Sequence, residues 1–297
     1  MKKIAIIVNR YDPIVGGTEK LAKTFCSHIL DNNYEVEIIT QPCLERGSSN
    51  YSYKINEVSL TDSNKFNNII EQGQYDLCFF FCDLHTPFLN NYKMHCKRNI
   101  CSLNLDERTY AARNQFPKAT QNLKKFDSVI TFTIDGVANK FFKENNIKQT
   151  YIQNFSRDVL STLLSEDYGN KIKKLFKVPD RDIIFYPAAF EERKNQLHVI
   201  QQMVEYSQLR EFNWIFIGPH NDSSYTSKCM QLSKQYELPA LFFKKTTNHQ
   251  VMDRLYQICD VVCLTSIAEG MPLILLESLS ANKPWVATPV GGIRGVL

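Results

Sequence analysis

Two carboxylates, Glu269 and Glu277, lie eight positions apart in the segment Glu-Gly-Met-Pro-Leu-Ile-Leu-Leu-Glu near the end of this sequence. An apolar run at 260–264 precedes them, and Pro272 opens a stretch with helical periodicity that runs to about Ala281. This pattern predicts a strand, a short loop and a helix N-terminus. Backbone N–H groups and the helix dipole favour an anion there, and the tilt of Cα–Cβ bonds aims Glu277 at the same point. We therefore expect a site for a phosphorylated, polyhydroxylated ligand.

Three further features follow predicted strands: the double glycine Gly16-Gly17, the basic pair Arg193-Lys194, and Gly218. Open α/β sheets bind ligands at the carboxyl ends of their strands. Each feature also has a purely structural interpretation, namely a turn that needs positive φ for the glycines and a solvated turn for the basic pair. In the functional interpretation, the glycines let the backbone approach a phosphate, and the lysine neutralises a diphosphate without a metal.

Glu277 likewise has two interpretations. Its carboxylate could accept hydrogen bonds from both hydroxyls of a ribose, as acidic residues do in dinucleotide-binding folds. It could instead be a solvated helix residue, although its position between Leu276 and Leu279 in an apolar helix disfavours that alternative.

The composition is that of a globular chain of 297 residues, long enough for two domains and with 43% hydrophobic residues to fill two cores. The net charge of +4 does not indicate nucleic acid, but it suits an anionic ligand or contact with an anionic membrane surface. We expect a cytoplasmic protein with reduced cysteines, because no signal peptide or membrane-spanning stretch is evident. The basic segment around 108–125 is either a solvated face or a peripheral contact with the inner face of the membrane.

Strands alternate with helices along the whole chain, which predicts an α/β protein with doubly wound sheets. The expected strands cover residues 4–8, 34–40, 54–60, 75–82, 99–105, 126–132, 149–152, 183–186, 213–217, 240–243 and 260–264. We expect two tandem Rossmann-like domains that face each other across a cleft. The first covers 1–178, including a connecting segment at 156–180, and the second covers 179–297.

Other chemistries have weak support. A zinc site could be assembled from Cys82, His85, His95 and Cys96, but no paired C-x2-C knuckle is present. The triplet Asp180-Arg181-Asp182 could bind a metal, but it precedes its strand instead of following it. A dehydrogenase is disfavoured because no G-x-G-x-x-G follows any strand.

Several motifs together resemble glycosyltransferase family four, whose members are retaining enzymes of the GT-B fold. The motifs are Gly-Gly-Thr-Glu at 16–19, Glu-Glu-Arg-Lys-Asn at 191–195, the segment 269–277, Ser-Ala-Asn-Lys-Pro at 280–284 and Val-Gly-Gly at 290–292. The resemblance spans the whole chain. It implies a retaining transfer of a sugar from a nucleoside diphosphate sugar to an acceptor hydroxyl, without a metal or another cofactor. The product would be a surface polysaccharide or a lipid-linked glycan.

The resemblance also implies roles for individual residues. Glu269, Lys194 and Arg193 would be catalytic, with the two cations stabilising the departing diphosphate, and Glu277 would hold the ribose. The donor-binding residues would be Gly16, Gly17, Gly218, Gly270, Met271, Pro272, Leu273 and Glu277. The first domain would bind the acceptor, and its candidate residues are His85, Asn104 and Asp106.

The sequence departs from the family pattern in four places. Ala189 stands where the family commonly has an Arg, so either Arg193 takes over its role or the diphosphate is held less tightly. The strand at 99–105 does not end in a His, and Gly295 stands where a Glu is common. The family continues beyond the point where this chain stops, so we expect an incomplete second domain. A non-catalytic nucleotide-sugar-binding subunit and a sugar-nucleotide epimerase remain alternatives.

Overall fold

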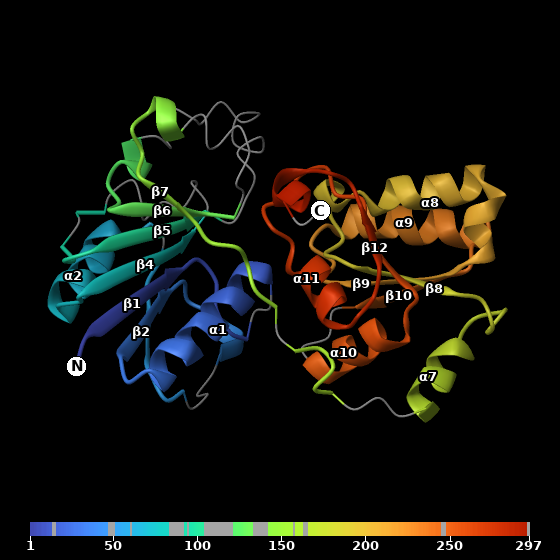
Figure 1. The fold of residues 1–297 in the computed structure, drawn as a ribbon, viewed down its shortest axis with the longest axis horizontal. Coiled ribbons are helices and arrows are strands. Elements are labelled where there is room, and N and C mark those ends of the chain that lie inside the picture. Colours follow the sequence, from blue (N-terminus) through green and yellow to red (C-terminus); the bar gives the residue numbers. More distant parts are fainter. Residues whose placement is uncertain are drawn as a thin grey trace. The chain divides into compact units, whose positions relative to one another are not determined.

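The computed structural model describes residues 1–13, 16–46, 51–59, 61–82, 92–93, 95–103, 121–132, 142–156, 158–162, 166–244 and 248–295 (Figure 1). The chain divides into two compact units, Met1–Gln153 and Asn154–Leu297. Among the described residues, no helix is both long and apolar enough to cross a membrane.

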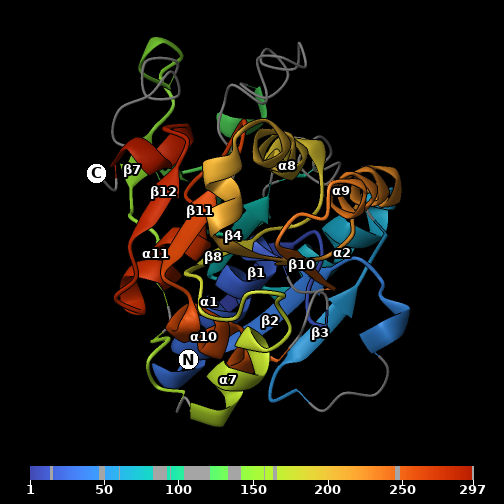
Figure 2. The same cartoon turned by 90° about the vertical axis from the view of Figure 1, so that its right-hand side faces the viewer.

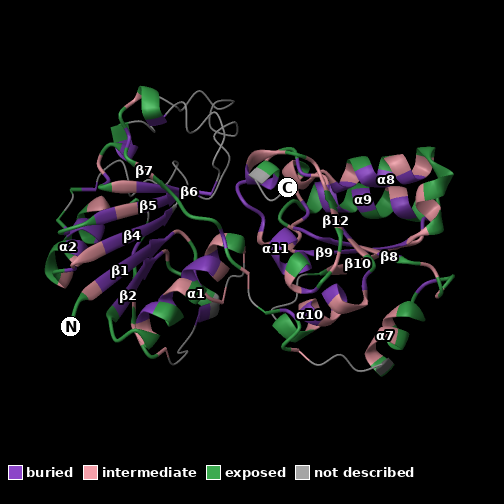
Figure 3. Ribbon diagram, viewed as in Figure 1, coloured by how far each residue is buried: buried purple, intermediate pink, exposed green. Residues whose placement is uncertain are grey.

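Unit 1 contains a seven-stranded parallel sheet with the order β3-β2-β1-β4-β5-β6-β7. Its strands are β1 (Lys3–Val8), β2 (Glu35–Thr40), β3 (Lys54–Glu57), β4 (Leu77–Cys82), β5 (Asn99–Leu103), β6 (Ser128–Thr131) and β7 (Gln149–Tyr151). Its described helices are α1 (Gly17–Asp31), the 3-10 helix η1 (Leu44–Arg46) and α2 (Ser63–Gly73). The central strands are buried and the helices expose one face (Figure 3), as expected for a sheet covered by helices.

Unit 2 contains a five-stranded parallel sheet with the order β10-β9-β8-β11-β12. Its strands are β8 (Ile183–Pro187), β9 (Asn213–Gly218), β10 (Ala240–Lys244), β11 (Val261–Leu264) and β12 (Trp285–Ala287). Its α-helices are α7 (Glu166–Lys173), α8 (Gln196–Glu205), α9 (Ser223–Gln235), α10 (His249–Ile258) and α11 (Leu273–Ser280), and its 3-10 helices are η2 (Glu192–Lys194), η3 (Ser207–Glu211) and η4 (Gly291–Gly295).

Two apolar cores lie on opposite faces of the unit 2 sheet, because successive side chains of a strand point to opposite sides. Tyr186 and Phe216 pack with α8 and α9 on one face, whereas Phe185 and Ile215 pack with α10 on the other. Helices α8 and α9 lie side by side, and α7 contacts α10 (Figures 1 and 2).

The predicted strands are present, and the predicted α/β class with two parallel sheets is confirmed. Strand β12 was not expected from the sequence, because Trp-Val-Ala is too short a run to stand out. The described part of the predicted connecting segment packs with unit 2. Val159 and Phe176 are buried in its core, and the Val159 N–H donates to the Ser280 hydroxyl at 3.1 Å. The sequence pattern also predicts a helix at 135–144, and most of that range lies outside the described residues.

Candidate functional site

Two loops meet at the carboxyl edge of the unit 2 sheet, one after β8 and one after β11. Tyr186, at the end of β8, is fully buried and joins them. Its hydroxyl donates to the Lys194 carbonyl at 2.5 Å and accepts from the Thr265 N–H at 2.9 Å. The Ile267 N–H also donates to the Arg193 carbonyl at 2.8 Å. Residues far apart in the sequence are thereby fixed next to each other.

Glu269 is the centre of this arrangement and is only 5% exposed. Its Oε1 atom lies 2.5 Å from the Lys194 Nζ atom and accepts a hydrogen bond of 2.5 Å from the Ser266 hydroxyl. Its Oε2 atom accepts from Arg193 Nη1 at 3.2 Å. The structure therefore brings together the three residues predicted to be catalytic. It adds Ser266, which the sequence analysis did not single out.

The charges of this cluster support one another. Burial alone would raise the pKa of Glu269, but the neighbouring Lys194 and Arg193 cations outweigh it and hold the pKa of the carboxyl below its ordinary value. Glu269 is therefore ionised at neutral pH. Burial lowers the pKa of Lys194 from its ordinary value, against the opposing attraction of Glu269.

Arg193 is shared between two carboxylates. Its Nη2 atom donates to Glu191 Oε1 at 2.7 Å, while its Nη1 atom donates to Glu269 and to the Ala268 carbonyl, the latter at 2.9 Å. On its other side, Glu191 accepts from Asn221 Nδ2 at 3.4 Å, in the loop after β9. Glu191 was noted in the sequence only as part of a motif, because nothing in its spacing shows which cation it meets.

The backbone before α11 is held from several sides. The Met271 carbonyl accepts from Asn154 Nδ2 at 2.9 Å, and the Gly270 carbonyl accepts from the Gly292 N–H at 2.6 Å. Pro272 is the N-cap of α11, and among the described residues no side chain caps this helix end. The first turn of α11 is therefore suited to face an anion, as the sequence predicts.

Glu277 is not a solvated helix residue, so that alternative is wrong. Glu277 is only 3% exposed, and its Oε2 atom accepts a hydrogen bond from the Tyr256 hydroxyl at 2.8 Å. Tyr256, in α10, is fully buried and packs edge-on against Phe185 with ring centroids 5.1 Å apart. Glu277 thus belongs to a buried polar contact between two helices, and its role toward a ribose stays a prediction.

Gly218 has a structural reason to be glycine, whereas at Gly16 a new β-carbon would meet only the end of a glutamate side chain. A β-carbon on Gly218 would lie 2.0 Å from the Ala188 carbonyl oxygen, so β9 can approach the loop after β8 only without a side chain. Gly16 has φ −136°, which is extended, so a turn with positive φ is the wrong explanation there. A β-carbon on Gly16 would instead lie 2.3 Å from Glu19 Oε2, and Glu19 is paired with Arg10 at 3.0 Å.

The acceptor-side candidates and the disfavoured metal-binding triplet can also be located in the sequence relative to the described elements. The acceptor-side candidates His85, Asn104 and Asp106 lie outside the described residues. Asp180 and Asp182 precede β8, so they lie at the amino end of the strand. In the described part of the chain, no group of three or more His, Cys, Asp or Glu side chains could hold a metal ion.

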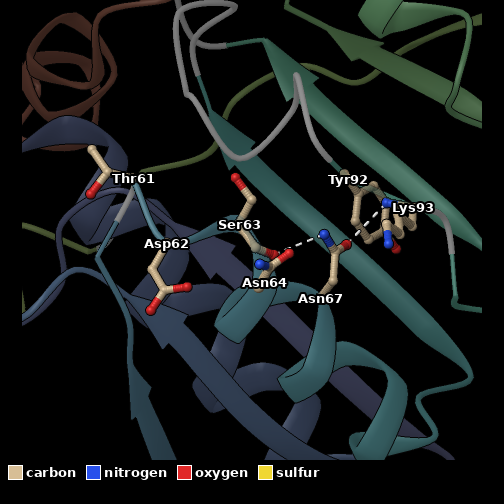
Figure 4. Close-up of a pocket in the computed structure, with 7 residues that line it drawn as sticks. All are labelled: Thr61, Asp62, Ser63, Asn64, Asn67, Tyr92 and Lys93. Atoms are coloured by element: carbon tan, nitrogen blue, oxygen red, sulfur yellow. Dashed lines mark hydrogen bonds between the residues drawn. The ribbon is translucent and has the colours of Figure 1, made fainter.

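A separate polar cavity of about 600 Å³ lies in unit 1 at the start of α2 (Figure 4). Two of its polar side chains, Asn67 and Asp62, already have partners. Asn67 donates to the Ser63 carbonyl at 2.8 Å and accepts from the Lys93 N–H at 3.0 Å, and Asp62 caps the helix by accepting from the Lys65 N–H. None of the predicted site residues lines this cavity.

Comparisons with known proteins agree with the fold. The chain is 23% identical over 327 aligned positions to the uncharacterized glycosyltransferase MJ1607 of Methanocaldococcus jannaschii, covering 99% of this chain and 82% of that protein. The structure of Anabaena Alr3699/HepE in complex with UDP-glucose matches with a TM-score of 0.78 at 15% identity, covering 100% of this chain and 83% of that one. Sucrose-phosphate synthase from Thermosynechococcus elongatus matches with a TM-score of 0.79 at 14% identity, covering 99% and 83%.

The match to a family model is confined to one part of the chain. Residues 167–297, which include β8 to β12 and the cluster around Glu269, match the model described as Glycosyl transferases group 1. Residues 167–297 are thus similar to glycosyl transferases group 1, and the whole chain has the fold seen in GT-B glycosyltransferase structures.

Proposed function

We propose that this protein is a retaining, metal-independent glycosyltransferase that moves a sugar from a nucleoside diphosphate sugar to an acceptor hydroxyl. The acceptor would be a glycan or a lipid-linked precursor of a surface polysaccharide. The protein would act in the cytoplasm, with peripheral contact at the inner face of the membrane.

One observation carries the proposal, namely the cluster in which Lys194 and Arg193 converge on the buried carboxylate of Glu269. The cluster lies at the carboxyl edge of a parallel sheet, where α/β folds bind nucleotides. It also precedes the N-terminus of α11, whose backbone N–H groups favour a phosphate. Two cations and a helix N-terminus together suit a nucleoside diphosphate.

The proposed chemistry follows from where charge develops. When the sugar–oxygen bond of the donor breaks, negative charge accumulates on the leaving diphosphate. Fixed cations stabilise that charge more than they stabilise the intact donor, which lowers the barrier. Lys194 and Arg193 would supply these cations. Glu269 would orient them and meet the donor sugar together with the backbone of 270–273, and Glu277 would accept from the ribose hydroxyls.

Isothermal titration with UDP, GDP and ADP, followed by donor turnover assays with the matching glucose conjugates, tests the proposal. We expect one nucleoside diphosphate to bind and its sugar conjugate to be consumed. Consumption should persist with EDTA present, and the transferred sugar should keep its anomeric configuration. An inverted product, or loss of turnover on metal removal, would contradict the corresponding part of the mechanism.

The same assays separate the two alternatives. Conversion of the donor sugar into its epimer without an acceptor would identify an epimerase. Nucleotide binding without turnover, across a panel of sugar and lipid-linked acceptors, would identify a non-catalytic binding subunit. If none of the nucleoside diphosphates binds, the assignment of the Glu269 cluster to a donor is wrong.

A further inference from the structure

We propose that Glu191 competes with the donor diphosphate for Arg193, so that donor binding exchanges one ion pair of Arg193 for another. The inference rests on the proposed function and assigns a role to a carboxylate that the reaction itself does not require. It makes Glu191 a residue that sets donor affinity.

The charges of the cluster are already balanced. Arg193 and Lys194 contribute two positive charges, and Glu191 and Glu269 contribute two negative charges that contact them directly. A diphosphate would therefore approach a neutral site instead of two free cations. To gain a direct contact with a guanidinium, it must displace a carboxylate from Arg193.

Burial decides which carboxylate is displaced. The Glu269 side chain is 7% exposed and is also held by Lys194, whereas the Glu191 side chain is 27% exposed. The loss of a partner costs an ionised carboxylate little free energy when water can replace that partner. It costs much when the carboxylate is buried. Glu191 also has a second partner, since Asn221 donates to its other oxygen. Glu191 is therefore the side chain that gives way.

The geometry of Arg193 fits such an exchange. Its Nη1 atom is directed inward, to the Ala268 carbonyl and to Glu269, and its Nη2 atom is bonded to Glu191. The Arg193 side chain is 31% exposed, so an incoming anion can reach it. The inner bonds can persist while the outer nitrogen changes partner from carboxylate to phosphate, which keeps the guanidinium in place.

The test compares Glu191→Gln with the neighbouring control Glu192→Gln by isothermal titration. Glu192 has the same charge and adjoins Glu191 in the chain, but in the described part of the chain no ion pair to Arg193 is found for it. The ligands are the nucleoside diphosphate that the wild-type protein binds and the corresponding nucleoside, which lacks phosphate. Thermal unfolding of both variants establishes that they fold.

We expect Glu191→Gln to bind the diphosphate about 3- to 10-fold more tightly than wild type, the gain from removing one partly screened like charge at close range. The diphosphate affinity of Glu192→Gln should stay within about twofold of wild type. Neither variant should change the affinity for the nucleoside, because the removed charge acts only on the phosphates. Unchanged or weaker diphosphate binding in Glu191→Gln would overturn the inference, since Glu191 would then only orient Arg193. An equal gain in Glu192→Gln would also overturn it.

These outcomes are separate from failure of the proposed function. If the wild-type protein binds a nucleoside diphosphate and Glu191→Gln does not bind it more tightly, the donor site stands and only the exchange is wrong. If neither the wild-type protein nor either variant binds UDP, GDP or ADP, the donor site itself is wrong, and the inference fails with it.

Discussion

A β-carbon on Gly291 would lie 1.7 Å from the carbonyl oxygen of Glu269. Gly291 also has φ +55°, a conformation that side chains with a β-carbon disfavour. The segment after β12 therefore packs directly on the backbone of the Glu269 loop, and this contact helps to hold that carboxylate in place.

Gly291→Ala should accordingly destabilise the protein by about 2–4 kcal/mol, since the clash is with backbone and adds to the strain at positive φ. Gly169→Ala in α7 is the control, because there the nearest atom to a new β-carbon is Ile258 Cγ2 at 3.5 Å. It should be neutral, or stabilising by about 0.5–1 kcal/mol. Urea unfolding of the two variants measures both effects, and equal stabilities would show that the loop can move away from Gly291.

The ion pair between Lys194 and Glu269 is predicted to matter for activity far more than an exposed pair of the same type. Lys194→Met should lower donor turnover by about 100-fold or more, by analogy with the loss of one group that stabilises developing charge. The control is Lys177→Met, since Lys177 pairs with Glu237 at 2.8 Å but the two side chains are 82% and 77% exposed. Water and salt screen such an exposed pair, so turnover and stability should stay near wild type.

Steady-state kinetics of the two lysine variants give the readout. If Lys194→Met only raises KM and leaves kcat unchanged, Lys194 binds the donor without favouring the transition state. Its role in stabilising the leaving diphosphate would then be wrong.

Tyr256 and Glu277 offer a test of the proposed ribose contact. Tyr256→Phe removes the hydroxyl that donates to Glu277 but keeps the ring that packs on Phe185, and it should cost about 1 kcal/mol of stability.

Glu277→Gln should remove the preference for a ribose over a 2′-deoxyribose, because a carboxylate accepts from both sugar hydroxyls better than an amide does. Titration with the nucleoside diphosphate and its 2′-deoxy form measures this preference. A wild-type protein that binds both forms equally would argue against a ribose contact by Glu277.

Some of this site could be predicted from sequence and some could not. The positions of Glu269, Lys194 and Arg193 could be predicted because each follows an apolar strand, and parallel strands place their carboxyl ends at one edge. Their catalytic roles were predicted from the resemblance to a family. Tyr186, Ser266 and Asn154 gave no such signal. A buried tyrosine in a strand or an asparagine in a loop has the same local pattern whether or not its polar atom meets the site, since the partner is far away in sequence.

The same limit applies to unit 1. The strand pattern predicts the sheet, yet it does not indicate that Arg46 is buried beside the loop after β1. There it donates to the Asp12 carbonyl at 2.8 Å and pairs with Glu57. Residues of this kind are ordinary polar loop residues in sequence, and only the folded chain shows that they clamp a backbone segment.

Glu37 in β2 predicts a pH dependence of stability that is independent of the proposed site. Burial alone would raise its pKa, but bonds from Lys3, Tyr75 and Asn56 outweigh that effect and lower the pKa to about 2. The folded pKa thus lies below the ordinary value of 4.5, so the folded state binds fewer protons than the unfolded state. The stability that Glu37 contributes is present above pH 4.5 and is lost as the pH falls from there toward 2.

Glu37→Gln should therefore flatten the fall in unfolding free energy between pH 4.5 and about pH 2, the window between its ordinary pKa and its folded pKa. Glu35→Gln is the matched control, because Glu35 also pairs with Lys3, at 3.4 Å, but its side chain is 49% exposed. Urea unfolding, monitored by circular dichroism at a series of pH values across this range, gives the slope of the unfolding free energy against pH for each variant. The two variants could instead flatten the pH dependence of the unfolding free energy equally. The buried network around Glu37 would then add nothing beyond an exposed ion pair, and the acid sensitivity would come from surface charge.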